Sequence, residues 1–382
     1  MKTHVLIQAR SSSSRLPFKS LLKINSFFIV QLLYKRVFSK KYKTTILTSL
    51  DKTDDYLYYL LKKNKLNCYR GDLSNVKKRF LSFTKNFKNE DIIVRLTADN
   101  IFINKNLVKF LVQQLINKKK NYLFINNKFS NLPYGISLEA FKYSYFKNNK
   151  NFSKLDKEHV TYSFDKSKQN SIKLNNEKKI WKKLNLSIDY LENYQFIKNI
   201  FKKIKNPTTI RWFKLCTFFE KSPVKNIYTK DLKVLSLRSK ELTNKRILEI
   251  CTLKMQEWKF PLKEQLRYFK FHYNKNDINN LIYIKKKLVG YTMLKKKKYK
   301  GVLVNLIDTV IIDKNYRKKN LGSILMNLNN SEICKYKLPS YLLCKSKELS
   351  FYNKFYWKKL NDQKIPYFNE NKKLKLMCLK FI

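Results

Sequence analysis

The chain has 382 residues, which is long for one compact domain and suits two. Its hydrophobic share of 43%, with 27 Phe and 25 Tyr, supplies apolar material for two cores and excludes global disorder. The formal net charge of +56 would suit a nucleic-acid binder, but lysine is spread along the whole chain among abundant Asn, Ile, Phe and Tyr. We therefore interpret the charge as a compositional bias over the entire surface.

Cysteine and histidine usage indicates neither a zinc site nor a disulfide framework, because the six cysteines form no CxxC pair and there are only three histidines. No apolar stretch reaches the roughly 18 residues that a membrane span needs. The first residues lead directly into a strand rather than into a signal segment. We expect a cytoplasmic protein without a membrane span.

Between residues 4 and 126, short β-rich runs alternate with amphipathic stretches of helical periodicity. The expected strands are 4–9, 44–49, 92–97 and 122–126, and the expected helices are 27–38, a helix beginning at 56–61, and 107–116. This alternation predicts a Rossmann-like α/β domain with a mostly parallel sheet. Ligands of such sheets bind beyond the carboxyl ends of the strands.

A basic, serine-rich loop without glycine, IQARSSSSRLPFK at residues 7–19, follows the first strand. Its backbone N–H groups and hydroxyls, together with Arg10, Arg15 and Lys19, could converge on a triphosphate, since arginine and lysine form charge-assisted bonds to phosphate oxygens. The alternative interpretation is an ordinary solvated loop.

The motif Ala9-Arg10-x-x-Ser13-x-Arg15-Leu16-Pro17-x-Lys19 closely resembles the signature loop of cytidylyltransferases that make CMP-activated acidic sugars, in particular the spore-coat polysaccharide type. Further matches follow in family order: Tyr69-Arg70-Gly71 with Arg79, Arg95-Leu96-Thr97-Ala98-Asp99, Pro133-Tyr134-Gly135 with Glu139, Glu158-His159-Val160-Thr161, and Leu186-Ser187-Ile188-Asp189. The chain departs from the family pattern at Phe18, usually Gly, at Asn75, often Asp, and at Asn193, where the family has a second acid.

The resemblance implies nucleotide-binding roles for seven residues of these motifs, namely Ala9, Arg10, Ser13, Arg15, Lys19, Arg70 and Arg79. It also implies Arg10, Lys19 and Asp99 as catalytic residues, and Asp99 and Asp189 as ligands of Mg²⁺. Both acids end apolar strand-like runs, and carboxylates there suit a hard divalent cation beside substrate phosphates. Helix capping is the alternative role for each Asp.

Glu139 and His159 are the candidate sugar-binding residues. Glu139 follows the Gly135 turn and could hydrogen-bond sugar hydroxyls, or it could be an ordinary exposed glutamate. His159 could contact the sugar or handle a proton, or it could be a structural histidine in a loop.

Proline-containing breaks place a domain boundary near residues 225 to 232, which gives a nucleotidyltransferase-like domain at 1–228 and a second domain at 232–382. In the second domain the expected elements are a strand at 234–238, a helix at 244–258 and strands at 281–285, 289–294, 302–312, 341–344 and 374–381. We expect an α+β fold for this domain.

In the run VIIDKNYRKKNLGSILMNL, a strand ends at Asp313, a basic turn follows, and Gly322 opens a helix whose N-terminus could bind a pyrophosphate. An ordinary strand-to-helix loop is the alternative. The layout resembles GNAT acyltransferases, which implies an acetyl-CoA site formed by Ile311, Arg317, Asn320, Leu321, Gly322 and Ser323. Asn320 replaces the first glycine of that loop, and asparagine is the residue that best tolerates positive φ after glycine.

Residues 349–357 resemble a later helix of the same family, with Tyr356 in place of Gly. Tyr352 then matches the tyrosine that protonates the departing CoA thiolate. Its alternative role is an aromatic core anchor.

These features lead to one principal hypothesis, a bifunctional enzyme of surface-glycan biosynthesis. The first domain would transfer CMP from CTP to an acidic, nonulosonic-type sugar with Mg²⁺, and the second would N-acetylate an amino sugar with acetyl-CoA. Two alternatives are a cytidylyltransferase with a non-catalytic GNAT-like domain, and a basic nucleic-acid-binding protein that has lost catalysis. A nucleic-acid partner is not expected, and a homodimer is left open.

Overall fold

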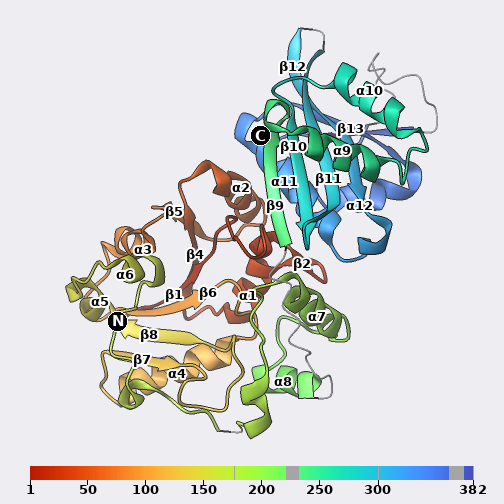
Figure 1. Ribbon diagram of the computed structural model, residues 1–382. Helices are drawn as coiled ribbons and strands as arrows, with labels where there is room; N and C mark the ends of the chain where they lie inside the picture. Colours follow the sequence, from red (N-terminus) through yellow and green to blue (C-terminus); the bar gives the residue numbers. More distant parts are fainter. Residues whose placement is uncertain (176, 221–231, 300, 361–373, 382) are drawn as a thin grey trace. The chain divides into compact units, whose positions relative to one another are not determined.

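The computed structural model describes residues 1–175, 177–220, 232–299, 301–360 and 374–381. The chain forms two compact units, Met1–Tyr228 and Thr229–Ile382 (Figure 1). The boundary that the sequence places near residues 225 to 232 lies almost wholly outside the described residues.

The first unit is an α/β structure whose strands and helices alternate along most of its length. Its strands are β1 (Thr3–Gln8), β2 (Lys23–Ile24), β3 (Phe27–Phe28), β4 (Lys43–Ser49), β5 (Cys68–Gly71), β6 (Ile92–Thr97), β7 (Tyr122–Ile125) and β8 (Leu138–Lys142). Its helices are α1 (Ile29–Val37), α2 (Asp55–Lys63), α3 (Val76–Thr84), α4 (Lys105–Asn117), α5 (Tyr143–Asn148), α6 (Lys154–His159), α7 (Leu191–Lys202) and α8 (Trp212–Glu220).

The main sheet of this unit has the order β5-β4-β1-β6-β8-β7. Strand β1 pairs in parallel with both β4 and β6, and β4 pairs in parallel with β5. Strand β8, which the sequence did not predict, runs antiparallel to β6 and β7. The prediction of a mostly parallel sheet is therefore confirmed, and the carboxyl ends of β1, β4 and β6 share one edge.

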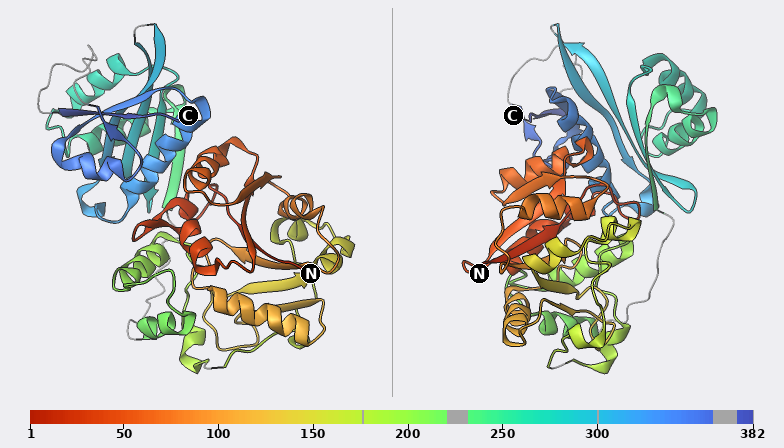
Figure 2. Two further views of the ribbon diagram at one scale, coloured as in Figure 1. Left: turned by 180° about the vertical axis from the view of Figure 1, so that it is seen from behind. Right: turned by 90° about the vertical axis from the view of Figure 1, so that its left-hand side faces the viewer.

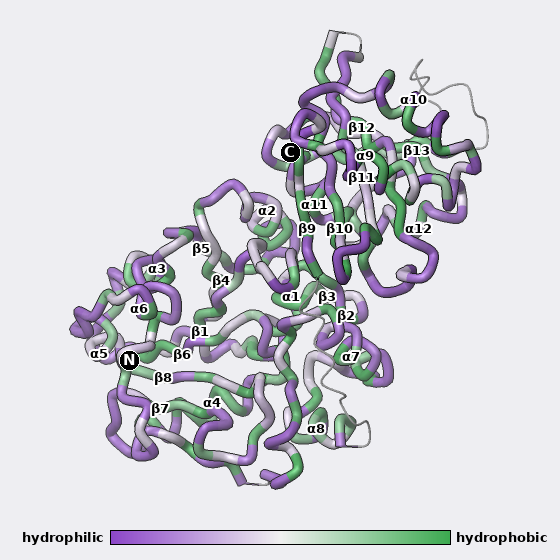
Figure 3. Tube along the Cα trace, in the orientation of Figure 1, coloured by the Kyte–Doolittle hydropathy of each residue, from purple (hydrophilic) through white to green (hydrophobic). Residues whose placement is uncertain are grey.

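Helices cover both faces of this sheet. Helices α1 and α4 pack against each other and against the sheet, whereas Val76 and Phe80 of α3 enter a core with Leu6, Ile93 and Phe141 on the opposite face. Because side chains alternate along a strand, each central strand contributes apolar residues to both layers. The hydrophobic colour along the strands and the hydrophilic connections between elements follow this arrangement (Figure 3).

Arg36 on α1 ties together segments that are distant in the sequence. Its guanidinium donates to the carbonyls of Phe102 (3.0 Å), Ile103 (3.2 Å), Pro207 (2.6 Å) and Ile210 (3.0 Å). The side chain is fully buried, so these four acceptors replace the water that the cation loses on folding.

The second unit is an α+β structure. Its strands are β9 (Leu232–Arg238), β10 (Ile278–Ile284), β11 (Lys287–Tyr299), β12 (Val302–Ile312), β13 (Ser340–Lys345), β14 (Lys358–Lys359) and β15 (Leu374–Leu379). Its helices are α9 (Asn244–Lys254), α10 (Leu262–His272), α11 (Leu321–Tyr336) and α12 (Leu349–Asn353). The helix expected to reach Trp258 ends at Lys254, and α10 was not predicted.

A seven-stranded sheet in the order β14-β15-β13-β12-β11-β10-β9 forms the middle of this unit. It is antiparallel except for β12 and β13, which pair in parallel. Helices α9 and α10 lie on one face and α11 on the other, as Figure 2 shows from the side. Beneath α11, buried Asn329 bonds Asn280 (2.9 Å) and Thr292 (2.9 Å).

Left-handed backbone is held without glycine at many places in this chain. Among the described residues, 11 non-glycine residues have positive φ, against two glycines. Lys285 (φ 49°) and Lys286 (φ 65°) even form the two-residue turn of the β10–β11 hairpin. Positive φ at both central positions is the type I′ pattern, which usually selects Asn-Gly.

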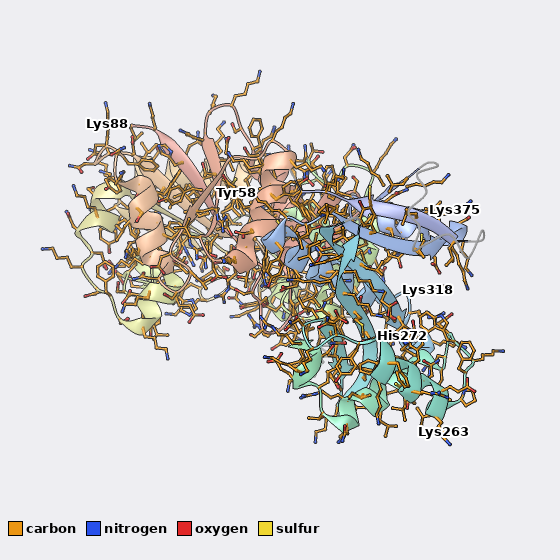
Figure 4. All side chains as sticks on the ribbon, turned by 90° about the horizontal axis from the view of Figure 1, so that it is seen from above. Tyr58, Lys88, Lys263, His272, Lys318 and Lys375 are labelled. Atoms are coloured by element: carbon orange, nitrogen blue, oxygen red, sulfur yellow. The ribbon has the colours of Figure 1, made fainter. Side chains whose placement is uncertain are left out.

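The surface carries lysine on many elements rather than on one face. Lys88 lies in the first unit, and Lys263, Lys318 and Lys375 extend from different elements of the second (Figure 4). Helices in the described part of the chain all fall short of the length and apolarity that a membrane crossing requires. No disulfide joins the cysteines of the described residues.

Candidate functional site

The loop after β1 turns sharply at Phe18, which adopts a left-handed conformation with φ 57° and ψ 22°. Its N–H donates to the carbonyl of Ser11 (3.0 Å), and the Ser13 hydroxyl accepts the N–H of Leu16 (3.3 Å). At the start of the loop, the buried Ala9 donates its N–H to Leu47 (3.1 Å). Phe18 therefore keeps the backbone shape for which glycine is the usual residue.

Asp54 holds this loop through a hydrogen bond to its backbone, and no motif of the sequence indicates this role. The fully buried carboxylate accepts the N–H of Ser11 (2.7 Å), the hydroxyl of Thr48 (3.0 Å) and the N–H of Ser49 (3.1 Å). Its only signal is its place in the acidic stretch after β4. Asp54 positions the loop against the end of β4.

Several backbone donors of the loop have no acceptor. The N–H groups of Arg10, Ser12, Ser14 and Arg15 donate to no residue that the structure describes. The Arg10 side chain is exposed beside them. Oriented N–H groups and a guanidinium at the end of a central strand form a favourable place for an anion.

Two carboxylates and two cations meet at this sheet edge. The ammonium of Lys19 lies 2.5 Å from Asp99 Oδ2 and 3.4 Å from Asp189 Oδ1. Arg15 also reaches Asp189, with Nη2 2.8 Å from Oδ1. The structure thus brings together four predicted residues that are up to 174 positions apart, since 189 minus 15 is 174.

Neighbouring hydroxyls orient both acids. Thr97 donates to Asp99 Oδ1 (2.6 Å), and Ser187 donates to Asp189 Oδ2 (3.0 Å). Burial alone would raise the pKa of Asp99, but Lys19 and Thr97 outweigh it and hold that pKa below its ordinary value. Asp99 is therefore ionised at neutral pH. The strand expected before Asp189 is absent, because residues 186–189 form an extended segment outside the sheet.

The acid pair fits a magnesium ion. Both carboxylates touch one ammonium, so both are within reach of a single cation. Within the described ranges, no group of three His, Cys, Asp or Glu side chains gathers as a metal site. Two carboxylates completed by substrate phosphates and water are the set that Mg²⁺ commonly takes.

Arg70 lies near this edge but is committed to the turn after β4. It donates to the carbonyls of Ser49 (2.7 Å) and Asp51 (3.0 Å) and to the carboxylate of Asp55 (2.7 Å). Three fixed bonds hold its guanidinium in place, which makes it a support of the site in this structure.

Arg79 is buried under the loop. It donates to the carbonyls of Asp72 (2.8 Å) and Leu73 (3.2 Å). A Cβ on Gly71 would lie 2.7 Å from its Cγ, so only glycine admits Arg79 there. Burial lowers the pKa of Arg79, and the nearby cation of Arg10 acts in the same direction.

Glu139, which we expected to bind the sugar or to be exposed, is enclosed within the fold. Glu139 lies on β8 and is buried, and it accepts from Arg95 (2.8 Å), Tyr122 (3.0 Å) and Thr161 (2.8 Å). Arg95 also donates to Gln8 (3.2 Å), the last residue of β1. Neither an exposed carboxylate nor one free for sugar hydroxyls is found, because both oxygens are bonded within the fold.

A strained turn supports this cluster. Val160 has φ 61° and ψ −50°, and the Thr161 N–H donates to the His159 carbonyl (2.6 Å), which together define a γ-turn of the rare positive-φ form. Such backbone at a β-branched residue persists only where its surroundings enforce it. The turn aims Thr161 at Glu139, while the His159 side chain is exposed.

The two asparagines that replace family acids cap helices. Asn75 accepts the N–H of Lys78 (2.8 Å) at the start of α3. Asn193 accepts the N–H of Tyr190 (3.0 Å) at the start of α7. An amide oxygen performs this capping as well as a carboxylate does.

In the second unit, the loop after β12 ends in a left-handed turn. Lys318 (φ 61°) and Asn320 (φ 64°) both have positive φ, and Ser323 donates to the Asn320 carbonyl (3.0 Å). The N–H groups of Leu321 and Gly322, in the first turn of α11, donate to no described residue. These donors and the helix dipole form a second place that favours an anion.

Arg317 pairs with Glu257 and donates Nε to the carbonyl of Ile312 (3.1 Å). Ile311 pairs with Tyr291 on β11, and its side chain enters the core under α9. Only the backbone of Ile311 is therefore in a position to meet a ligand.

Strands β12 and β13 pair over a short length. Asn305–Ile307 face Ser340–Leu342, while β12 continues to Ile312 and β13 to Lys345. The second half of β12 thus presents an edge that β13 does not cover. A ligand with amide groups could pair along it.

Tyr352 lies on α12 and is 8% exposed. Burial raises its pKa, so the phenol stays protonated. The ring of Phe351, the residue before Tyr352, has its Cζ atom 3.2 Å from the position that a Cβ on Gly322 would take. Helix α12 therefore packs against the first turn of α11, which brings Tyr352 near the anion-favouring loop.

Asp308 is a functional candidate that the sequence analysis missed. A β-bulge lies opposite Met293 and Leu294, and it leaves Asp308 outside the register of β12. Its carboxylate pairs with Lys295 (3.0 Å) on the face covered by α9 and α10. The available signal was a lone aspartate inside the apolar run VLVNLIDTVII.

Comparison with known proteins gives a family match over residues 4–269, to a model described as cytidylyltransferase. An uncharacterized protein of Methanocaldococcus jannaschii is 34% identical over 167 residues, 42% of this chain and 66% of that relative, slightly under two thirds. The spore coat polysaccharide biosynthesis protein SpsF of Bacillus subtilis is 26% identical over 57% of this chain and 94% of its own. A cytidylyltransferase structure from Leptospira borgpetersenii has 27% identity and a TM-score of 0.52, covering 58% of this chain and 95% of that one.

Proposed function

Because the chain belongs to the cytidylyltransferase family, we propose that its first unit transfers CMP from CTP to an acidic sugar of the nonulosonic type. The observation that carries the proposal is the meeting of Lys19, Asp99 and Asp189 beside a loop with unused N–H donors. The name of the Bacillus relative supports a role in surface-polysaccharide synthesis.

In this reaction the loop donors, Arg10 and Arg15 hold the triphosphate of CTP. The sugar hydroxyl oxygen bonds to the α-phosphorus in line while the bond from this phosphorus to the α–β bridging oxygen breaks. Pyrophosphate leaves with the electron pair, and the hydroxyl proton passes to water. Lys19 places a positive charge beside the reacting phosphates. Asp99 and Asp189 would hold a Mg²⁺, which would supply neutralisation of the charge that develops on the leaving pyrophosphate. The fold contributes mainly position and charge.

For the second unit we infer transfer of an acetyl group from acetyl-CoA to an amine, by a GNAT-like fold. Three features support it: the donor-bearing start of α11, the uncovered edge of β12, and a protonated Tyr352 near that loop. The pantetheine amides would pair with β12, and Tyr352 would protonate the departing thiolate. A unit that binds CoA without turnover is the alternative.

The test of the first activity is pyrophosphate release from CTP and Mg²⁺ with a panel of nonulosonic acids. Release that depends on one of the sugars, with CTP preferred to UTP, ATP and GTP, is the expected result. Equal rates with UTP or ATP, or release without any sugar, would contradict the proposal.

The test of the second activity is binding of acetyl-CoA by the full chain, followed by thiol release with amino sugars. Binding with turnover supports acetyl transfer. Binding without turnover on any amine favours the non-catalytic alternative.

A further inference from the structure

Lys254, the last residue of α9, has a buried side chain whose ammonium still reaches solvent. The residue is 6% exposed, and its ammonium makes no hydrogen bond or ion pair with any residue that the structure describes. Burial lowers its pKa, while Asp308 acts in the opposite direction. The end of a helix offers it only a diffuse partial charge.

The other buried cations of the described residues differ from Lys254. Four buried lysines and arginines have hydrogen-bond or ion-pair partners within the fold, and these are Arg36, Lys77, Arg79 and Lys295. The Lys254 ammonium, which no described residue bonds, is instead reached by water. An anionic group of a ligand can displace that water and form a charge-assisted bond with the ammonium.

Aromatic rings flank this ammonium. Its Nζ lies 5.1 Å from the centre of the Tyr268 ring and 5.8 Å from that of Trp258. Tyr268 is 45% exposed and Trp258 39%, so each ring contacts both Lys254 and solvent. Flat aromatic faces beside a cation suit a ring-shaped ligand that carries an anionic group.

A carboxylate lies on the same face of the sheet. The bulged Asp308 pairs with Lys295 at 3.0 Å, yet its side chain is still 24% exposed. Met293 of β11 packs against α9, and Lys295 follows two residues later on the same face of the sheet. Its partner Asp308 therefore lies on the side of the sheet that α9 covers. This face therefore carries both the Asp308 carboxylate, which a ligand amine can reach, and the Lys254 ammonium, which no described carboxylate bonds.

We propose that Lys254, with Trp258 and Tyr268, binds the acidic group of the acceptor in the second unit, so that the acceptor is an amino sugar carrying a carboxylate or a phosphate. The amine lies toward Asp308 and the sugar ring against the aromatic side chains. That the ligand is an acetyl acceptor rests on the proposed acetyl transfer. That it carries an anionic group rests on the contacts of Lys254.

The experiment is calorimetric titration of the full chain, with saturating CoA and at physiological salt to suppress nonspecific binding to the basic surface. The probes are muramic acid, which carries a carboxylate, glucosamine 6-phosphate, which carries a phosphate, and glucosamine, which carries neither. We expect one acidic probe to bind at least about tenfold more tightly than glucosamine, as one charge-assisted bond implies. The acidic probe with the higher affinity shows whether a carboxylate or a phosphate is recognised.

Lys254→Met should remove this advantage, and the matched exposed-lysine variant Lys263→Met on α10 should keep it. Lys254→Met should also melt no lower than the wild type, since it removes a buried charge without leaving a partner unpaired. Retained preference in Lys254→Met, or no preference in the wild type, would overturn the proposal. A large loss of stability would instead assign Lys254 a structural role, which also overturns it.

Failure of the proposed acetyl transfer has a separate signature. Absence of CoA binding would contradict that function, while a Lys254-dependent preference for acidic probes would still establish the anion site. Conversely, CoA turnover with equal use of glucosamine and both acidic probes would leave acetyl transfer standing and refute the subsite.

Discussion

The loops after β1 and after β12 both offer unused N–H donors at the end of a central strand, but they differ in countercharge. In the first unit Lys19 and Arg15 already contact Asp99 and Asp189. In the second, Glu257 pairs with Arg317 and Asp313 with Lys287, while the lysines at 318 and 319 are exposed. Acids among the cations make a site suited to a metal with a phosphate, whereas cations at a helix N-terminus suit a phosphate alone.

The largest expected effect tests the acids of the first loop. Asp99→Asn or Asp189→Asn should lower pyrophosphate release by at least about a thousandfold, because each removes several kcal/mol of charge stabilisation and 1.4 kcal/mol is tenfold. Binding of acetyl-CoA to the second unit should not change. Steady-state assay and calorimetry measure the two effects.

The matched control is Asp165→Asn, an exposed aspartate of the same unit whose bonds are local. It should keep wild-type turnover. Turnover within tenfold of wild type in either acid variant would remove the distinction between the two loops.

The second loop should respond to charge rather than to metal. Replacing Lys318 and Lys319 together by Met should weaken acetyl-CoA binding by about tenfold at low ionic strength, since each exposed cation contributes up to about 1 kcal/mol. The loss should shrink in high salt, and the KM for CTP should stay the same. An unchanged affinity for acetyl-CoA would place its phosphates elsewhere.

The sequence predicted much of this difference, because patterning is local. Apolar runs located β1, β4, β6, β7, β10 and β12, and the family resemblance brought Asp99 and Asp189 to one edge. Strand β8 escaped because it contains Glu139, an ionisable residue that is buried only through Arg95 on another strand. Whether these residues form a buried strand depends on Arg95, which is distant from Glu139 in the sequence.

The same reason explains the missed residues. Asp54 supports the loop through its bond to the Ser11 N–H, and Lys254 stands out because no described residue bonds its ammonium. Neither property exists in a local pattern. Similarly, Glu139 was placed at the site by resemblance, whereas its three donors were visible only in three dimensions.

Both loops and the β10–β11 hairpin contain non-glycine residues with positive φ. A smaller effect tests how much free energy of folding this conformation costs. Lys286→Gly, in the hairpin before β11, should stabilise the second unit by about 1 kcal/mol, because the left-handed region is unfavourable for residues with a Cβ. Thermal unfolding measures it. Phe18→Gly should instead destabilise the first unit, since that ring is 8% exposed and its burial is lost.

The matched control is Lys297→Gly within β11, a lysine without positive φ, which should destabilise because glycine weakens a strand. Equal effects of Lys286→Gly and Lys297→Gly would show that the turn carries no strain.

The smallest expected effect is a dependence of the first unit's stability on pH. Burial lowers the pKa of His4 on β1 below 6.5, although Asp91 opposes this. The unfolded chain therefore binds the proton more readily, so the stability from neutral His4 is complete above pH 6.5 and declines as pH falls toward the folded-state pKa. Unfolding of the first unit at pH 8 and pH 5.5, with and without His4→Leu, measures it. The same pH dependence in both proteins would contradict the assignment.

The buried Arg36 also has a consequence for how the chain is made. Two of its four acceptors, Pro207 and Ile210, are synthesised about 170 residues after it. While the ribosome is still making the intervening segment, α1 has a cation whose final partners do not yet exist. The first unit can therefore complete its packing only when nearly all of it has emerged, and a nascent chain stopped before residue 207 should remain open to proteases around α1.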